Sequence, residues 1–243
     1  MQRVNDVIVL DLESTVNGNH MVFRPSAIVM PDGTLTLVDT GLPGMAGVID
    51  TQLREAGFSL DDVKQVIVTH HDLDHIGSLE AVVGQTGADV LALEAEVPYI
   101  TGEKRSQKLP SEEQTQQLLA DPNLDPARRA MLTRPPVRVP VTRALHDGED
   151  LPGGLRIVAT PGHTVGHASV YVSGSRTLIT GDALTSQDGT LKGPNERATP
   201  DMPTALESVK KLAGLDVQTI LAYHGGLVTE NADAQLKELA AHP

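Results

Sequence analysis

Short hydrophobic runs alternate with amphipathic segments over the first part of the chain. Val66-Ile67-Val68 is typical of a buried strand, and residues 46–56 place Val48, Ile49 and Leu53 on one helical face. In residues 34–39 threonines alternate with Leu and Val, which predicts outward threonines and inward aliphatic side chains. The predicted elements are strands at 7–12, 27–30 and 34–39, a helix at 46–56, a strand at 66–68, a helix at 78–83 and a strand at 89–93.

Residues 94–150 interrupt this alternation with a polar, proline-rich stretch. Two short helices are predicted there, near 111–120 and 126–132. The stretch is either a surface excursion that covers part of the sheet or a substrate lid, because long insertions in compact domains often serve binding. Both interpretations stay open.

Strands and helices return in the second half of the chain. The pattern predicts strands at 155–160, 168–172 and 177–179, a helix at 203–212, a strand at 217–221 and a polar C-terminal helix.

Composition narrows the chemistry. The chain has 243 residues, enough for one large domain or two small ones, and its aromatic content of 2% leaves few platforms for stacking bases. A formal net charge of −13 argues against nucleic-acid binding, and an anionic substrate would need local attraction, with a metal as the first candidate. The chain has no cysteine, so disulfides and thiolate catalysis are excluded and a metal would have only nitrogen and oxygen ligands.

The most informative motif is the run Thr69-His70-His71-Asp72-Leu73-Asp74-His75, in which five of seven side chains can bind a metal. We call residues 69–75 the ligand loop. It follows the predicted strand at 66–68, and the ends of strands in α/β sheets commonly face a crevice. So many His and Asp residues in succession indicate a metal site.

Three other predicted strands are also followed by a His or Asp among small residues. Pro161-Gly162-His163 follows one strand, Gly181-Asp182 the next and Tyr223-His224-Gly225 the last. Glycine allows sharp turns and close approach of the backbone to an ion. Each motif alone is a weak signal, but their joint occurrence at strand ends is a strong one.

Together these motifs resemble the metallo-β-lactamase superfamily, whose members carry Asp-Thr-Gly, His-x-His-x-Asp-His, Pro-Gly-His, Gly-Asp and a late His. Here they are Val38-Asp39-Thr40-Gly41, the ligand loop, His163, Asp182 and His224, and the match runs from about residue 7 to 228. The resemblance is greatest to the glyoxalase II-like bacterial probable metallo-hydrolases. It implies an α/β (α+β) fold, a four-layer αβ/βα sandwich in one domain spanning 1–243, with the metal site at one edge of the two sheets.

The resemblance also implies roles for individual residues. His70, Asp72 and His163 would bind a first metal ion, Asp74, His75 and His224 would bind a second, and Asp182 would bridge the two. Asp74 would in addition orient a metal-bound hydroxide that attacks the substrate carbonyl. The cofactors would be two divalent ions, zinc first, with manganese or iron as alternatives.

Asp72 departs from the commonest family pattern, which has His at this position. Two divalent ions, Asp74, Asp182 and a hydroxide sum to +1, and Asp72 lowers this count to zero. An extra oxygen ligand makes manganese or iron more competitive with zinc. Asp72 could instead leave the first site weak or empty.

Five further side chains are expected near the site. Asp39 resembles a residue that supports the ligand loop. His71 should point away from His70 and Asp72, because side chains of an extended segment alternate, and His167 should support rather than bind, since Gly162 and Gly166 disfavour a helix there. Tyr223 and Tyr99 are expected to pack, with donation to a substrate oxyanion (Tyr223) and lining of a lid (Tyr99) as alternatives.

The resemblance implies a metal-dependent hydrolase that acts on a small carboxylic ester, lactone or thioester. One alternative is a mononuclear-iron oxidoreductase of the persulfide-dioxygenase type, with His70, His163 and Asp182 as ligands. Phosphodiester hydrolysis is less favoured because of the acidic charge and scarce aromatics. We expect a cytoplasmic protein with a small-molecule substrate and without nucleic-acid or membrane partners, because no signal segment or membrane-length apolar run is present. The sequence leaves the oligomeric state open.

Overall fold

Two β-sheets face each other in the computed structural model, which describes residues 1–16 and 18–242. The first sheet contains, in spatial order, β1 (Gln2–Val4), β2 (Val7–Val9), β5 (Ser26–Val29), β6 (Leu35–Val38), β7 (Val63–Val68), β8 (Asp89–Leu93) and β9 (Arg143–Leu145). The second contains β10 (Asp150–Leu151), β11 (Leu155–Ala159), β12 (Ala168–Val172), β13 (Thr177–Ile179), β16 (Thr219–Ala222) and β17 (Gly226–Val228). Two hairpins add β3 (Leu12–Val16) with β4 (Asn19–Phe23), and β14 (Thr185–Gln187) with β15 (Thr190–Lys192).

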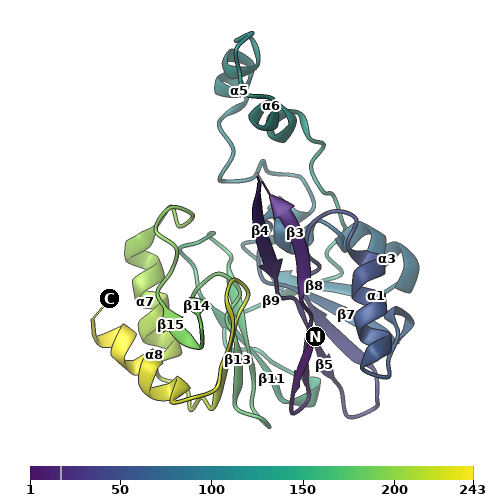
Figure 1. Ribbon diagram of the computed structural model, residues 1–243, viewed down its shortest axis with the longest axis vertical. Coiled ribbons are helices and arrows are strands. Elements are labelled where there is room, and N and C mark those ends of the chain that lie inside the picture. The colour runs from purple at the N-terminus through teal and green to yellow at the C-terminus, as the bar shows by residue number, and fades with distance from the viewer. Residues whose placement is uncertain (17, 243) are drawn as a thin grey trace.

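Helices cover the outer face of each sheet, which gives the expected four layers (Figure 1). On the first sheet lie α1 (Ala46–Glu55) and α3 (Leu79–Thr86), and on the second lie α7 (Met202–Leu212) and α8 (Ala232–Ala241). Ile67 of the first sheet and Ile157 of the second belong to the aliphatic core between the sheets. The predicted sandwich is therefore confirmed.

The central strand β6 corrects one prediction. Thr36 is 1% exposed and is not outward-facing, because β6 lies between two neighbouring strands and is covered on both faces. Leu35 and Leu37 pack toward the helices, whereas Val38 packs between the sheets. Because both faces of β6 are buried, the alternation of Thr and aliphatic residues did not show that Thr36 also lies in the interior.

The stretch 94–150 holds the two expected helices, α5 (Glu112–Leu119) and α6 (Pro126–Thr133), and the short α4 (Val97–Ile100). Its predicted end was wrong, because β9 and β10 already belong to the two sheets. We call residues 101–138 the excursion lobe. Figure 1 shows α5 and α6 projecting beyond the sheets rather than lying against a sheet face.

Several short elements escaped the sequence pattern, including β1, β4, β9, β14, β17 and the one-turn helix α2 (Leu73–Ile76) inside the ligand loop. The missed strands other than β4 have only three residues, which are too few positions for a periodic signal. Within residues 1–16 and 18–242 no helix combines the length and apolar character needed to cross a membrane.

Candidate metal centre

The predicted ligands come together where strands of both sheets end. Asp39 follows β6, the ligand loop follows β7, and Asp182 and His224 follow β13 and β16. In each sheet these two strands run parallel and adjacent, so the residues that follow them emerge at the same edge. His163 enters from the turn between β11 and β12.

Two groups of ligand atoms form at this edge. One comprises His70, His163 and Asp182, and the other comprises Asp74, His75 and His224; within each group the ligand atoms lie within 4.8 Å of one another. Asp182 lies between the two groups. Its Oδ1 is 3.2 Å from His75 Nε2, and its Oδ2 is 3.3 Å from His163 Nε2 and 3.4 Å from His224 Nε2.

Three buried atoms of the site fit a metal ion. Among the described residues, His70 Nε2, His75 Nε2 and Asp182 Oδ1 have no hydrogen-bond partner although water does not reach them. Buried polar atoms are otherwise almost always paired, because leaving one unpaired costs about 1–3 kcal/mol. Imidazole nitrogen and carboxylate oxygen together are ligands typical of zinc, manganese and iron.

The histidines of the site differ in the direction in which their pKa values are shifted. Burial lowers the pKa of His70 well below its ordinary value. Burial also acts against protonation of His224, but Asp182 and Asp74 outweigh it and raise the pKa of His224 to about 9. In the same way burial opposes protonation of His75, yet Asp182 and two further carboxylates raise the pKa of His75 well above its ordinary value. Burial would raise the pKa of Asp182, but His75 and His224 hold it low.

Asp39, which the family resemblance suggested as a supporting residue, contacts the ligand loop through its side chain. It is 1% exposed and accepts hydrogen bonds from the Thr69 amide at 2.8 Å and the Thr69 hydroxyl at 2.7 Å. Its Oδ2 also lies 2.8 Å from His75 Nδ1. A proton on Nδ1 leaves His75 Nε2 free as a ligand atom, which is the usual arrangement behind a metal-binding histidine.

His167 lies behind the first ligand group with both ring nitrogens engaged. Its Nδ1 is 2.8 Å from Thr160 Oγ1, and its Nε2 accepts the Asp182 amide at 3.0 Å. Burial lowers its pKa to about 3, which keeps the ring neutral. Gly181 is the neighbour that permits this contact, because its φ is +52° and a Cβ there would come within 2.8 Å of His167 Nε2. His167 thus orients Asp182 through its backbone.

His71 points away from both ligand groups and stacks on Tyr99, with ring centroids 4.8 Å apart. Its Nδ1 contacts Glu96, a fully buried acid that the sequence interpretation missed. Glu96 Oε1 accepts the His71 amide at 2.8 Å, and Oε2 accepts the Thr164 hydroxyl at 3.0 Å and the Gly166 amide at 2.9 Å. It therefore ties the ligand loop to the loop of His163. Its position shortly after β8, another strand end, was the available signal.

We expect Glu96→Ala to destabilise the protein by at least about 3 kcal/mol, because the His71 amide and two further donors would be buried without a partner. Denaturant unfolding with and without metal measures this loss. The matched control is Glu94→Ala, since the Glu94 side chain is 74% exposed. Equal stability of the two variants would contradict the tie between the loops.

Asp72 lies beside the first ligand group, with Oδ2 3.3 Å from His70 Nε2 and 3.1 Å from His163 Nε2. Lys108, from the excursion lobe, contacts the same Asp72 oxygen and lies 2.6 Å from His163 Nε2. Sequence reasoning missed Lys108, since nothing in the local pattern ties it to the site. With two divalent ions, a hydroxide and the three aspartates, the formal charge of the site would be zero. The positive charge of Lys108 raises this sum to +1 and so offsets the extra negative charge of Asp72.

Tyr223 is 3% exposed, its ring stacks on His75 at 3.8 Å between centroids, and its hydroxyl donates to the Asp74 carbonyl. Tyr223 is therefore packed in the structure, and its hydroxyl, which the alternative assigned to a substrate oxyanion, is engaged by the Asp74 carbonyl. Burial raises the pKa of Tyr223 well above its ordinary value, so the phenol stays protonated.

Comparison with known proteins agrees with this geometry. The family model described as the metallo-beta-lactamase superfamily matches residues 21–224. The probable metallo-hydrolase YflN of Bacillus subtilis is 31% identical over 224 residues, covering 85% of this chain and 81% of that protein. A hydroxyacylglutathione hydrolase of Brucella anthropi is 27% identical over 209 residues; the match covers 81% of this chain but only 62% of that longer protein.

A solved structure shows the same likeness in three dimensions. The metallo-beta-lactamase family protein TTHA1429 from Thermus thermophilus superposes with a TM-score of 0.70 and 26% sequence identity, covering 98% of this chain and 79% of that one.

Proposed function

Because this chain belongs to the metallo-beta-lactamase superfamily, we propose that it hydrolyses a small carboxylic ester, lactone or thioester with the help of two divalent metal ions. The observation that carries the proposal is the pair of ligand groups, with Asp182 between them and three buried ligand atoms without another partner. The Bacillus subtilis relative is a probable metallo-hydrolase, and the Brucella anthropi relative is by name a hydrolase of an acylated glutathione. Both names support hydrolysis.

The proposed ligands of the first ion are His70, His163, Asp182 and Asp72, and those of the second are Asp74, His75, His224 and Asp182. When bound, two such ions activate water at neutral pH and polarise the target carbonyl. Zinc is the first candidate, with manganese or iron favoured by the added oxygen of Asp72.

Asp74 is the proposed orienter of the attacking water. Its Oδ2 lies 3.2 Å from His224 Nε2 within the second group, while the residue also lines the cavity beside the site. A carboxylate at this boundary can hold the water toward a substrate carbonyl and accept its proton. Tyr223 keeps Asp74 in place through the bond to its carbonyl.

The mononuclear-iron alternative is favoured by one observation, because His70, His163 and Asp182 form the set of two His and one carboxylate that such iron sites use. Against it stands the second group, whose His75 Nε2 is also buried without a partner among the described residues. A single ion would leave that group unexplained. The two-metal hydrolase is therefore the stronger proposal.

Elemental analysis combined with a substrate panel tests the proposal. We expect two divalent ions per chain and hydrolysis of at least one aryl ester, lactone or thioester, with loss of activity after chelation and recovery when metal is restored. Activity that persists after complete metal removal would contradict the mechanism. One iron per chain with oxygen uptake would instead support the oxidoreductase.

A further inference from the structure

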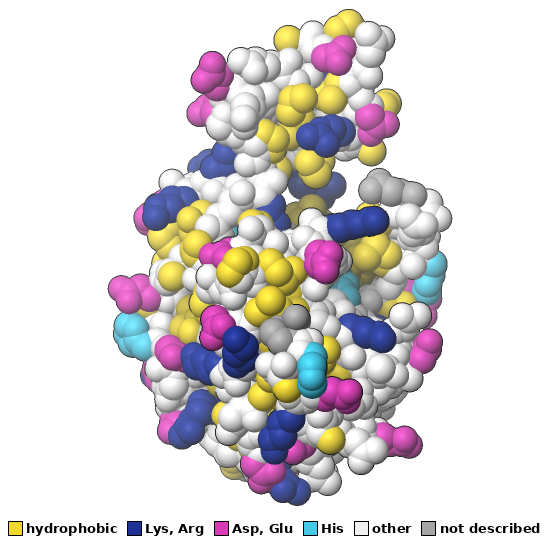
Figure 2. Space-filling model, turned by 90° about the vertical axis from the view of Figure 1, so that its left-hand side faces the viewer, with side chains coloured by type: hydrophobic (Ala, Val, Ile, Leu, Met, Phe, Trp, Pro, Cys, Tyr) yellow, Lys and Arg dark blue, Asp and Glu magenta, His cyan; other side chains and the backbone are white. Residues whose placement is uncertain are grey.

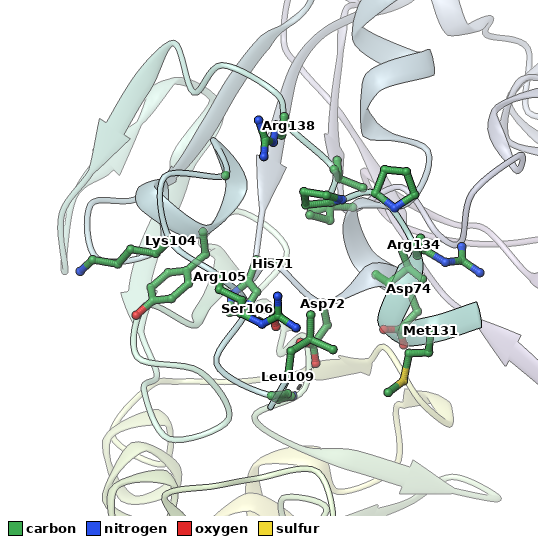
Figure 3. A pocket seen from close by; sticks show the side chains of 18 of the residues that line it. His71, Asp72, Asp74, Lys104, Arg105, Ser106, Leu109, Met131, Arg134 and Arg138 are labelled. Atoms are coloured by element: carbon green, nitrogen blue, oxygen red, sulfur yellow. Dashed lines mark hydrogen bonds and ion pairs between the residues drawn. The ribbon is translucent and has the colours of Figure 1, made fainter. Parts of the chain in front are cut away.

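A cavity of about 550 Å³ opens between the metal centre and the excursion lobe. Asp72 and Asp74 line one side, and the other side is lined by residues from two segments of the lobe, among them Arg105, Leu109 and Met131 (Figure 3). Figure 2 shows the lobe standing off from the body, with a hollow between them that is bordered by Lys, Arg and hydrophobic side chains. This volume suits a small ligand.

The side chains that line the cavity are predominantly cationic, although the chain as a whole is acidic. The chain carries −13, yet the only acids that line the cavity, within the part of the chain that the structure describes, are the proposed metal ligands Asp72 and Asp74. The acids of the excursion lobe lie outside the lining; they are Glu103, Glu112, Glu113, Asp121 and Asp125. The cations that line the cavity are Lys104, Arg105, Lys108, Arg134 and Arg138. This segregation concentrates positive potential where a substrate would enter.

The cations differ in what already holds them. Arg105 is fixed by bonds from Nε to the Pro110 carbonyl at 2.8 Å and from Nη2 to Thr115 Oγ1 at 2.7 Å, so its guanidinium is positioned without an acid. Arg134 and Arg138 form no ion pair within the described residues, whereas half of the other arginines of the chain pair with an acid. Unpaired arginines around a cavity are either solvated or available to a ligand.

Apolar side chains fill the rest of the lining. Leu73 and Ile76 come from the metal-centre side, and Leu109, Met131 and Val137 come from the lobe. Met131 is 47% exposed and lines the cavity, so its side chain is accessible to a ligand there. The cavity therefore offers both an apolar surface and several cations.

We propose that this cavity binds the substrate and selects esters or thioesters whose acyl part is apolar and ends in an acidic group, a carboxylate or a phosphate. The inference rests on the proposed hydrolase function. The scissile carbonyl would lie at Asp72 and Asp74, the acyl chain against Met131 and its apolar neighbours, and the acidic group on the arginines. Lys108, which contacts the proposed metal ligands Asp72 and His163, also lines the cavity and adds to this positive charge.

Two esters that differ only in a terminal carboxylate test the proposal on the metal-loaded protein: 4-nitrophenyl hexanoate and mono-4-nitrophenyl adipate. We expect kcat/KM to be about tenfold or more higher for the adipate ester, as one charge-assisted contact allows. The double variant Arg134→Gln, Arg138→Gln should lose that advantage, so that kcat/KM becomes similar for the two esters. The double variant Lys192→Gln, Lys237→Gln, with the same loss of two charges at exposed positions outside the cavity, is the matched control.

Binding to the metal-free protein gives a readout that does not depend on hydrolysis. Calorimetry with adipate and with hexyl phosphate should show weaker binding to the double arginine variant, and the better ligand identifies carboxylate or phosphate as the acidic group. If neither ester is cleaved but this binding persists, the hydrolase proposal fails and the anion site stands. Equal turnover of both esters, or binding that the arginine variants leave unchanged, would overturn the inference.

Discussion

Asp182→Asn should cost the protein bound metal at both ligand groups and reduce hydrolysis on the order of a thousandfold, more than the ~100-fold typical of changes behind a metal ligand. The reason is its position: one carboxylate oxygen faces His75, and the other faces His163 and His224. Asparagine keeps the shape but turns one of these atoms into an NH₂ donor and removes the charge. No other described side chain contacts both groups in this way.

Metal content per chain and kcat measured on the same preparation check this expectation. Asp188→Asn is the control, since Asp188 is an exposed acid in the turn between β14 and β15. Circular dichroism of the chelated variants separates loss of metal from loss of fold. An Asp182→Asn protein that holds two ions and keeps its activity would refute the bridging role.

The residue pattern predicted strands and helices in both halves and a metal site at strand ends for one physical reason, whereas the sandwich and the ligand roles were implied by the family resemblance. Hydrophobic runs mark strands, and the ends of parallel strands share an edge, so a His or Asp after several strands indicates a common site. His163 and Asp182 illustrate this, because they are far from the ligand loop in the chain and yet lie beside His70. The family resemblance supplied the order of the layers, and the family match confirms it.

The sequence could not predict contacts made across the fold by residues without a local pattern. Glu96 is buried and joined to two loops, and only the packing of β8 beside them shows it. Lys108 reaches the site from a lobe whose course no periodicity predicts. Thr36 was misplaced because a strand covered on both faces accepts a polar side chain when its backbone is paired.

The excursion lobe changes the expected source of substrate attraction. The acidic composition made a metal the first candidate for attracting an anionic substrate, whereas the cavity brings together cations that are scattered along residues 104–138. Asp72 fits the same picture. Its negative charge lies in contact with the Lys108 ammonium. Asp72, which stands where the family commonly has His, and a lysine of the lobe are therefore electrostatically complementary.

Metal uptake should depend steeply on pH, and mainly at the second ligand group. Imidazole binds a metal only when neutral, so a bound proton must leave first. In the metal-free protein the pKa of His224 is raised to about 9 and that of His75 is also raised, whereas burial keeps His70 neutral. Affinity for the second ion should therefore fall at least about tenfold for each pH unit below about 9. Affinity for the first ion should depend less on pH.

Titration calorimetry in buffers of different ionisation enthalpy counts the protons released, and elemental analysis after dialysis at pH 6 to 9 shows which ion is lost first. The free energy of unfolding of the metal-free protein should show the opposite dependence on pH. Because the folded-state pKa of His224 lies above its ordinary 6.5, the protonated ring stabilises the metal-free fold. That contribution is complete below about pH 6.5 and disappears as the pH rises through about 9.

Metal affinity that falls at low pH, together with a metal-free fold that loses stability at high pH, distinguishes protonation of His224 from general acid or alkaline unfolding. If His224 and its acidic neighbours are responsible, His224→Gln should flatten both curves, in the loaded and the chelated protein alike. His20→Gln, which removes an exposed histidine 3.3 Å from Glu13, should leave both unchanged. Uptake of two ions with no proton release at pH 7 would mean that His75 and His224 are already neutral, and the charge arrangement around Asp182 would need another explanation.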